Sequence, residues 1–207
     1  MVDFGHGEEG QTPLTQDELA QLIPTHILTR GELDELEAEN IREAIAWWAR
    51  RRRRDLLSIE FVRELHQRMY GDVWKWAGQF SRENDRPLGA DANQIEPELR
   101  ILIDDTLCWI ENSSFADPHE LLSTFHHRLT RIHPFPNGNG RWARLMTDLL
   151  AERTERPQIS WGGTAAEGAL HQVGTVDRDV YIGGLRAADG HNLQPLTELI
   201  KTWSREA

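Results

Sequence analysis

The sequence has little cysteine: Cys108 is its one thiol among 207 residues. A single cysteine excludes an internal disulfide framework and a cluster of thiolate metal ligands. Because Cys108 lies in the apolar, helix-patterned stretch 101–110, we expect its thiol to be buried and without chemistry. The low cysteine content also suits a cytoplasmic protein.

Long apolar runs are missing as well. No stretch approaches the roughly 20 consecutive apolar residues that cross a bilayer, and residues 1–10 are acidic and glycine-rich, unlike a signal peptide. We therefore expect no membrane span and a cytoplasmic location. The hydrophobic content of 39% and the charged content of 28% instead indicate a globular chain, long enough for one domain and a modest extension.

The chain also lacks an excess of positive charge. Its 34 acidic residues outnumber its 23 basic ones, for a formal net charge of −11, which argues against direct nucleic-acid binding. Five consecutive arginines, Arg50–Arg54, depart from this balance. They indicate either the solvated end of a helix, where the dipole favours positive charge, or a docking patch for an anionic partner.

Apolar residues recur at helical intervals through most of the sequence, which predicts an all-α helical bundle. The clearest helix start is Asp117-Pro-His-Glu120, with an N-cap residue, a first-turn proline and a glutamate in the first turn. Its apolar pattern stops at Pro134. Other helices are expected after Ser58, from Pro97, after Gly140, and over residues 165–185 and 194–203.

The same pattern predicts how the chain is organised. Residues 1–20 indicate a flexible N-terminal arm, and residues 21–57 an N-terminal helix with one apolar stripe. A single domain is expected over residues 58–205, with no internal repeat. Within it, the polar stretch 81–96 is punctuated by Pro, Gly, Asn and Asp, so we expect a loop or a small β-hairpin there.

The side chains best suited to chemistry gather in residues 133–144, His-Pro-Phe-Pro-Asn-Gly-Asn-Gly-Arg-Trp-Ala-Arg. The turn Asn137–Gly140 lies between two predicted helices, so its backbone N–H groups and the following helix N-terminus form an anion-binding nest. Arg141 and Arg144 lie one turn apart and reach the same anion. His133 adds the side chain best suited to proton transfer near neutral pH. Together they predict a site for phosphoryl or nucleotidyl transfer.

This segment resembles the signature of the Fic (Fido) family, His-x-Phe-x-(Asp/Glu)-Gly-Asn-Gly-Arg-x-x-Arg, at every fixed position except one. Residues 65–78 and 181–196 resemble the segments that flank the signature in that family. The resemblance covers about residues 58–205. The whole chain is most similar to the subgroup called mobile mystery protein B, which bacterial mobile elements carry.

The resemblance implies an all-α Fic-type bundle with a small β-hairpin flap. It also implies a protein adenylyltransferase that uses ATP and Mg²⁺ to move AMP to a Ser, Thr or Tyr hydroxyl. His133 would be the general base that deprotonates that hydroxyl. The residues implied to anchor the loop and hold the nucleotide are Phe135, Gly138, Asn139, Gly140, Arg141, Arg144 and Tyr181.

One fixed position departs from the signature, since Asn137 stands where the family usually has an acidic Mg²⁺ ligand. An amide oxygen ligates Mg²⁺ without adding negative charge, so we expect weakened metal binding. The departure leaves open a phosphotransferase, a transferase of another nucleotide-derived group, and a non-catalytic nucleotide-binding regulator. A metal-dependent hydrolase is a weaker alternative because no HExxH pattern accompanies the histidines that suggest it, which are His119, His126, His127 and His133.

The resemblance gives a meaning to the segment Pro87–Gln94, which composition alone indicates to be a surface loop. It falls where the family has a flap hairpin that holds the target protein by strand addition. The implied partner is therefore a protein that presents a hydroxyl side chain at this flap. A homodimer is compatible with the same reading.

A second implied feature is an inhibitory helix at residues 36–40, where a glutamate pairs with the second arginine of the signature in many members. Glu37 is the first candidate, because it shares a helical face with Leu33, Asn40 and Ile41 and should point inward. Glu39 is the second candidate and should point elsewhere. The serine or threonine that usually precedes this glutamate is absent.

Overall fold

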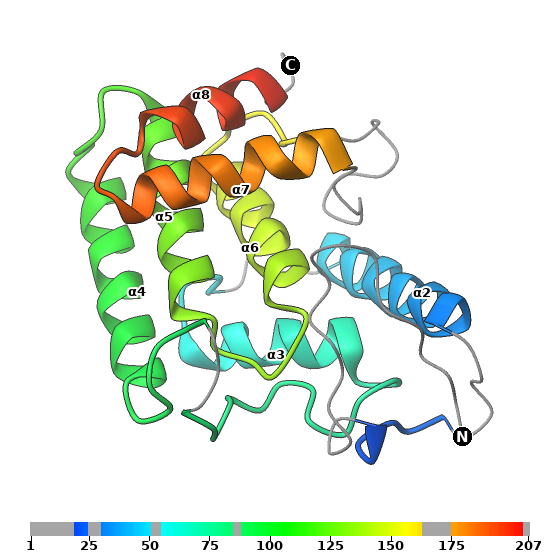
Figure 1. Ribbon diagram of the computed structural model, residues 1–207. Coiled ribbons are helices and arrows are strands. Elements are labelled where there is room, and N and C mark those ends of the chain that lie inside the picture. The colour runs from blue at the N-terminus through cyan, green and yellow to red at the C-terminus, as the bar shows by residue number, and fades with distance from the viewer. Residues whose placement is uncertain (1–18, 25–29, 51–54, 85–87, 163–174, 205–207) are drawn as a thin grey trace. The chain divides into compact units, whose positions relative to one another are not determined.

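The structure is a computed structural model that describes residues 19–24, 30–50, 55–84, 88–162 and 175–204. These residues form seven helices, and their extended backbone pairings are two isolated bridges rather than a sheet. The all-α prediction is thus confirmed (Figure 1). No helix of the described part is long and apolar enough to cross a membrane.

The chain divides into two compact units. The first comprises residues 1–54 and 60–79, and the second residues 55–59 and 80–207. Each unit is described by itself. The arm, N-terminal helix and domain that the sequence predicts stay predictions, and nearly all of the arm lies outside the described residues.

The first unit contains α2 (Arg30–Ala49) and most of α3 (Ile59–Tyr70). Trp48 near the end of α2 packs edge-on against Phe61 of α3, with ring centroids 5.2 Å apart. Further along, the Asn40 amide accepts a hydrogen bond from the Asp72 backbone N–H at 3.0 Å and donates to the Asp72 carboxylate at 3.2 Å. These contacts fix α2 against α3 and against the loop that follows α3.

That loop turns at Gly78, whose φ of 71° lies in the left-handed region that favours glycine. A Cβ here would approach the Arg63 carbonyl oxygen to 2.9 Å. The Gly78 N–H donates to His66 Nδ1 at 3.0 Å, and its carbonyl accepts from Arg63 Nε at 3.0 Å. Gly78 therefore fixes the turn at the end of this loop, within the first unit.

The described residues of the second unit form a bundle of five helices. They are α4 (Ile95–Glu111), α5 (Pro118–Ile132), α6 (Asn139–Arg153), α7 (Thr175–Asp189) and α8 (Gln194–Trp203). Helix α5 packs against α4, α6 and α8, and α7 lies alongside α8 (Figure 1). The α5 side of the core consists of Leu121, Leu122, Phe125, Leu129 and Ile132.

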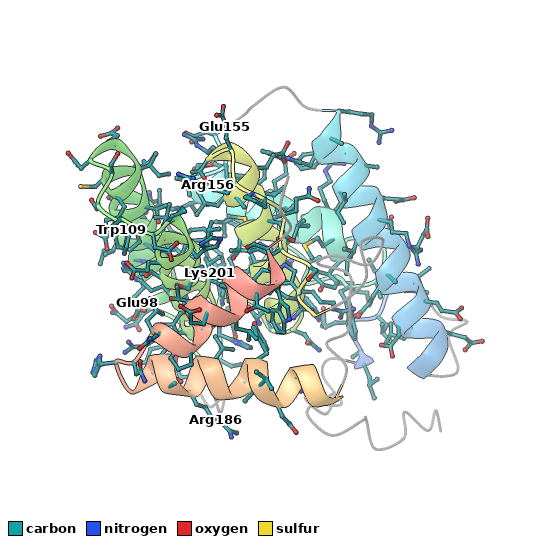
Figure 2. The ribbon with its side chains drawn as sticks, turned by 90° about the horizontal axis from the view of Figure 1, so that it is seen from above. Glu98, Trp109, Glu155, Arg156, Arg186 and Lys201 are labelled. Atoms are coloured by element: carbon teal, nitrogen blue, oxygen red, sulfur yellow. The ribbon has the colours of Figure 1, made fainter. Side chains whose placement is uncertain are left out.

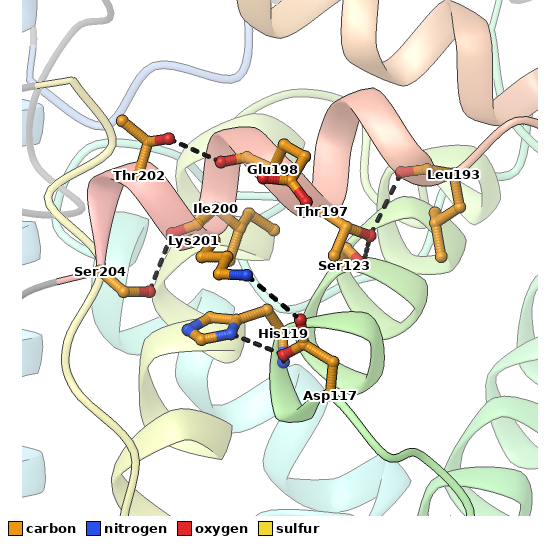
Figure 3. Close-up of polar contacts among 10 residues, drawn as sticks. All are labelled: Asp117, His119, Ser123, Leu193, Thr197, Glu198, Ile200, Lys201, Thr202 and Ser204. Carbon is orange, nitrogen blue, oxygen red and sulfur yellow. Dashed lines mark hydrogen bonds and ion pairs between the residues drawn. The ribbon is translucent and has the colours of Figure 1, made fainter.

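Helix α5 begins where the sequence predicts. The Asp117 carboxylate is the N-cap and accepts from the His119 backbone N–H at 2.9 Å, with Pro118 in the first turn. Lys201 of α8 approaches Asp117 at 3.9 Å, and the buried hydroxyls of Ser123 and Thr197 lie 2.7 Å apart (Figure 3). The N-terminal half of α5 is thereby tied to α8.

The other helix boundaries follow the predictions with small differences. Helix α8 spans the predicted residues, whereas α4 begins at Ile95, before Pro97, because a proline fits anywhere in the first turn, where N–H groups have no intrahelical partner. Helix α7 continues to Asp189, and the part of its prediction over residues 165–174 lies outside the described residues. Exposed Arg186 projects outward from α7 (Figure 2).

The prediction that Cys108 is buried is wrong. The buried positions of α4 are Ile95, Leu99, Leu102, Ile103 and Thr106. At helical spacing this stripe leaves position 108 on the outer face, and the thiol is exposed. Its Sγ lies 3.3 Å from Asn112 Nδ2, which donates to it.

Candidate functional site

The predicted site lies in the second unit, at the connection between α5 and α6. His133 is the C-cap of α5 and adopts a left-handed conformation with φ 50° and ψ 59°, while its backbone N–H donates to Leu129 O at 3.1 Å. Gly138 is the N-cap of α6, also left-handed, with φ 76°. A left-handed histidine is uncommon and fixes how the chain leaves α5. The loop thus runs directly from the candidate base to the N-terminus of a helix.

Phe135 anchors this loop in the core. Its side chain is 0% exposed and packs edge-on against Trp142, with ring centroids 5.1 Å apart. Asn139 closes the loop around it, since its Oδ1 accepts from Phe135 N at 2.9 Å and its Nδ2 donates to Phe135 O at 2.8 Å. The Asn139 amide is therefore committed to the loop, and its contribution to anion binding is the backbone N–H.

The predicted anion nest falls at the N-terminus of α6. Trp142 N donates to Gly138 O at 3.0 Å at the start of this helix, and the first-turn N–H groups of an α-helix generally lie outside its intrahelical hydrogen-bond ladder. Gly140 is exposed, which leaves its backbone open to approach. This helix end has the donors and the dipole that bind phosphate.

Arg144 lies behind this nest rather than on the surface. Its side chain is 6% exposed and runs back toward the helix N-terminus, so that Nη1 lies 3.7 Å from the position of a Cβ on Gly140. Arg141, by contrast, is half-buried. The two arginines of the segment are thus one buried and one accessible cation beside the same helix end.

Asn137 is tied into the loop as well. Its Oδ1 accepts from the Gly138 backbone N–H at 2.7 Å. An amide oxygen has two lone pairs, so this type of ligand can bind a magnesium ion as well as accept a hydrogen bond. The residue thus fits a metal role as one neutral ligand, with phosphate and water oxygens completing the shell.

Tyr181 of α7 is placed in the core beside Arg144. Its side chain is 5% exposed, its hydroxyl oxygen lies 2.7 Å from His126 Nε2, and the Arg144 guanidinium is a further polar neighbour of this hydroxyl. Burial raises the pKa of Tyr181. The sequence names Tyr181 among the nucleotide-binding residues, and that role stays a prediction.

His126 is buried in a polar network that the sequence did not predict. It lies on the apolar face of α5, is 0% exposed, and its Nδ1 is 3.0 Å from Thr147 Oγ1. Burial, followed by the nearby Arg144 charge, lowers the pKa of His126 to about 3, so this imidazole is neutral. A histidine inside an otherwise apolar helix stripe is the signal that points to such a buried polar network.

The segment before α4 flanks His133 on both sides. Ser81 N donates to Pro134 O at 2.9 Å, and Ala90 N donates to Ile132 O at 3.0 Å. The expected hairpin is not formed by residues 81–84 and 88–94, because the Ser81 and Ala90 N–H groups bond to Pro134 and Ile132 instead of to each other's strand. Residues 85–87, including Pro87, lie outside the described residues.

The other histidines considered for a metal site have separate partners. His119 Nδ1 lies 2.7 Å from the Asp117 carboxylate, and His127 Nε2 lies 2.8 Å from Asp189. No group of three His, Cys, Asp or Glu residues in the described ranges is arranged to hold a metal ion. The geometry therefore lends no support to the hydrolase alternative.

In the first unit, the two candidate inhibitory residues differ as predicted. Glu37 is 3% exposed, and its Oε1 accepts from Trp74 Nε1 at 2.7 Å. Glu39 is exposed and forms an ion pair with Arg42 on the same helix. The contrast in burial is confirmed, whereas an inhibitory role for either residue stays a prediction.

The connection from α5 to α6 thus combines a histidine C-cap, a buried aromatic anchor and a glycine-capped helix end with two arginines. Residues 56–151 match the Fic/DOC family. This matched segment contains the signature His133–Arg144, in agreement with the resemblance.

Curated relatives agree over part of the chain. The chain is 31% identical over 105 residues to "Protein adenylyltransferase Fic" of Drosophila virilis, a match that covers 50% of this chain and 22% of the relative. The same protein of Drosophila melanogaster matches equally, over 21% of its length. The chain thus spans about a fifth of the length of these relatives.

Solved structures show the same fold over most of the chain. BepC of Bartonella tribocorum, solved with bound AMPPNP, aligns with a TM-score of 0.65 and 17% identity, over 93% of this chain and 100% of that one. Fic-1 from C. elegans aligns with a TM-score of 0.65 and 22% identity, over 90% of this chain and 52% of that one. These likenesses establish the Fic-type helical fold.

Proposed function

We propose that this protein is a Fic-type nucleotidyltransferase that moves AMP from ATP to a Ser, Thr or Tyr hydroxyl of a protein. The observation that carries the proposal is the arrangement at the N-terminus of α6, where the Arg144 side chain runs back beside Gly140. One short loop separates this helix N-terminus from His133. A base, a phosphate nest and a buried guanidinium are what an in-line displacement at phosphorus requires. The adenylyltransferase name of the Drosophila relatives supports the same reaction.

In this proposal His133 accepts the proton of the target hydroxyl. The hydroxyl oxygen bonds to the α-phosphorus, the bond from that phosphorus to the bridging oxygen breaks, and pyrophosphate leaves. The N–H groups at the start of α6 hold the inner phosphates, Arg141 the outer ones, and Arg144 orients the terminal phosphate. Positioning and charge neutralisation supply most of the catalysis.

The proposal also includes a magnesium ion, to which the protein would supply one ligand. When bound, the ion would neutralise charge on the phosphates. Asn137 Oδ1 would be its protein ligand while continuing to accept from Gly138 N. Because this ligand is neutral, we expect weaker Mg²⁺ binding than with a carboxylate.

The target protein is proposed to dock along the segment Pro87–Gln94. The bonds from Ser81 and Ala90 to the residues on either side of His133 support this, since they bring the segment to the candidate base. A cytoplasmic location, a homodimer and the mobile mystery protein B subgroup are kept as proposals on the sequence arguments alone.

Regulation by α2 is the last part of the proposal. We infer that the buried Glu37 restrains transfer, because a carboxylate that pairs with the second arginine of the signature competes with the terminal phosphate. Its burial and its bond to Trp74 support a fixed side chain. Exposed Glu39 is the second candidate.

A non-catalytic nucleotide-binding regulator is the second candidate function, favoured by the neutral Asn137 at the metal position. The protein is incubated with Mg²⁺ and ATP labelled at the α- or γ-phosphate, and its intact mass is measured. This experiment distinguishes an adenylyltransferase from a phosphotransferase and from a non-catalytic regulator. Addition of the mass of AMP with α-label supports adenylylation, whereas γ-label indicates a phosphotransferase. Nucleotide binding without any transfer, to itself or to lysate proteins, indicates the regulator. His133→Ala is the control and should bind nucleotide without transferring it.

A further inference from the structure

A chain of buried polar groups runs through the second unit behind the phosphate nest. It joins Arg144 and Thr147 of α6, His126 of α5 and Tyr181 of α7. Their exposures are 6%, 0%, 0% and 5%, respectively. Polar groups this deep are costly unless every one has its hydrogen-bond partner. The direction of each bond is therefore informative.

The direction of the chain follows from the hydroxyl of Thr147. Thr147 Oγ1 donates its single hydrogen to Ala143 O at 2.8 Å, so it accepts in its contact with His126 Nδ1 at 3.0 Å. His126 Nδ1 therefore carries the ring hydrogen. The Ala143 carbonyl, which also interacts with His126, is an acceptor and requires the same hydrogen.

The remaining bonds then have one arrangement. Since the buried imidazole is neutral, His126 Nε2 has a lone pair and accepts from the Tyr181 hydroxyl at 2.7 Å. The Tyr181 oxygen is thus left as an acceptor toward Arg144, whose guanidinium has donors alone. Each group thus donates to the next one along the chain. Arg144 donates to Tyr181, Tyr181 to His126, His126 to Thr147, and Thr147 to the Ala143 carbonyl.

We propose that Tyr181 and His126 are positioning residues that hold the Arg144 guanidinium in the orientation that receives the terminal phosphate. This inference rests on the proposed function, in which Arg144 binds that phosphate. A guanidinium binds phosphate through a planar fork, so its rotation decides whether two donors or one meet the ligand. Tyr181 offers its hydroxyl oxygen as an acceptor to this guanidinium, whose Nη1 lies 3.7 Å from the position of a Cβ on Gly140.

Tyr181 has a different role here from that of a direct nucleotide contact. Its hydroxyl bonds to His126 and has Arg144 as its charged neighbour, and its ring packs edge-on against Trp161, 6.4 Å between centroids. Both polar functions of the side chain are thus directed into the protein. Its effect on the ligand passes through Arg144.

The test compares ATP with AMP, because AMP lacks the phosphates that Arg144 would hold. Tyr181→Phe keeps the ring and removes the hydroxyl, and calorimetry should show an ATP affinity about 3- to 10-fold lower, which matches the net contribution of one ordinary hydrogen bond. AMP affinity should be unchanged. In an Arg144→Ala background, Tyr181→Phe should have no further effect on ATP binding.

Three further variants guard against a merely structural effect. Ser123→Ala removes another buried hydroxyl of this unit, bonded to Thr197, and should leave the ratio of ATP to AMP affinity at the wild-type value. His126→Gln keeps an acceptor for Tyr181 and should bind ATP better than His126→Leu, which has none. Should Tyr181→Phe fail to fold, this His126 pair makes the same comparison.

The outcomes separate this inference from the proposed function. Equal losses for ATP and AMP, or additive effects of Tyr181→Phe and Arg144→Ala, overturn the positioning role. ATP binding that depends on Arg144 but not on Tyr181 or His126 overturns it while leaving the proposed function intact. A wild-type protein that binds no nucleotide overturns both.

Discussion

The indole Nε1 of Trp74 donates a hydrogen bond of 2.7 Å to Oε1 of Glu37. The carboxylate is buried on the inner face of α2, and the donor comes from the loop after α3. A buried carboxylate with a fixed donor has a defined direction, unlike the exposed Glu39 paired with Arg42. This difference decides which glutamate is worth testing as the inhibitor.

Replacing Glu37 by glycine should raise auto-modification well above the wild-type level, at least several-fold, because it removes the proposed competitor of the terminal phosphate. Transfer of α-labelled AMP to the protein itself is the measurement. Glu39→Gly introduces the same helix-weakening residue, about 1 kcal/mol relative to alanine, and should change labelling little.

Glu37→Gln isolates the charge in this comparison. Glutamine keeps an oxygen for Trp74 Nε1 and loses the negative charge, so it should activate as glycine does. Equal, low labelling in wild type and all three variants would show that α2 supports the fold and does not restrain the enzyme.

Asn137→Asp should lower the Mg²⁺ concentration needed for half-maximal transfer several-fold. Aspartate retains the acceptor for the Gly138 N–H and adds a charge near the N-terminus of α6, where the dipole favours it. A magnesium titration of the transfer rate is the measurement. Coincident titrations of wild type and variant would mean that residue 137 does not meet the metal.

Asn139→Ala should lower the free energy of unfolding by about 2–4 kcal/mol, since each of two buried backbone groups of Phe135 loses its partner. Urea denaturation measures this directly. Asn137→Ala is the matched control, because it removes an amide from the same loop at a half-buried position. A similar, small loss in both variants would contradict the bracing role given to Asn139.

Stability should fall with decreasing pH because of His126. Its pKa is about 3 in the folded protein and near 6.5 when unfolded, so between these values the unfolded chain binds a proton that the folded chain does not. The contribution is complete above pH 6.5 and is lost as the pH falls, by about 1.4 kcal/mol per pH unit.

The groups that face this imidazole are Arg144, Tyr181, Thr147 and the neighbouring His127. Denaturation of wild type and His126→Gln at pH 7, 6 and 5 provides the measurement. The wild-type slope should exceed that of the variant, which has no group to protonate at this position. Parallel slopes would place the acid sensitivity elsewhere.

The sequence predicted those features whose cause is local. Asp117 caps α5 through a bond to a residue two positions away, and Pro134 stops it, so both signals lie within a few residues of the helix ends. The segment predicted to bind an anion also has a local cause, because it consists of one turn and the start of the next helix. These parts were predictable from spacing alone.

The features that escaped prediction depend on contacts across the chain. The His126–Tyr181 bond joins residues 55 positions apart, and the loop before α4 bonds to Ile132 and Pro134 rather than to itself. Composition carries no information on which distant group completes such a bond. For the same reason the outward position of Cys108 follows from the register of α4 and not from its apolar surroundings.

The two backbone bonds from Ser81 and Ala90 have a consequence for how such a site diversifies. They attach the segment at its ends, to the carbonyls on either side of His133, and backbone groups make them whatever the side chains are. Between these two points, the Asn84 side chain accepts from Ala92 N at 2.8 Å, so this residue is the one to keep when the stretch is exchanged. Under the proposed docking of the target along this segment, a new target preference is then reachable by exchanging the other side chains of that short stretch, while the backbone bonds beside His133 remain.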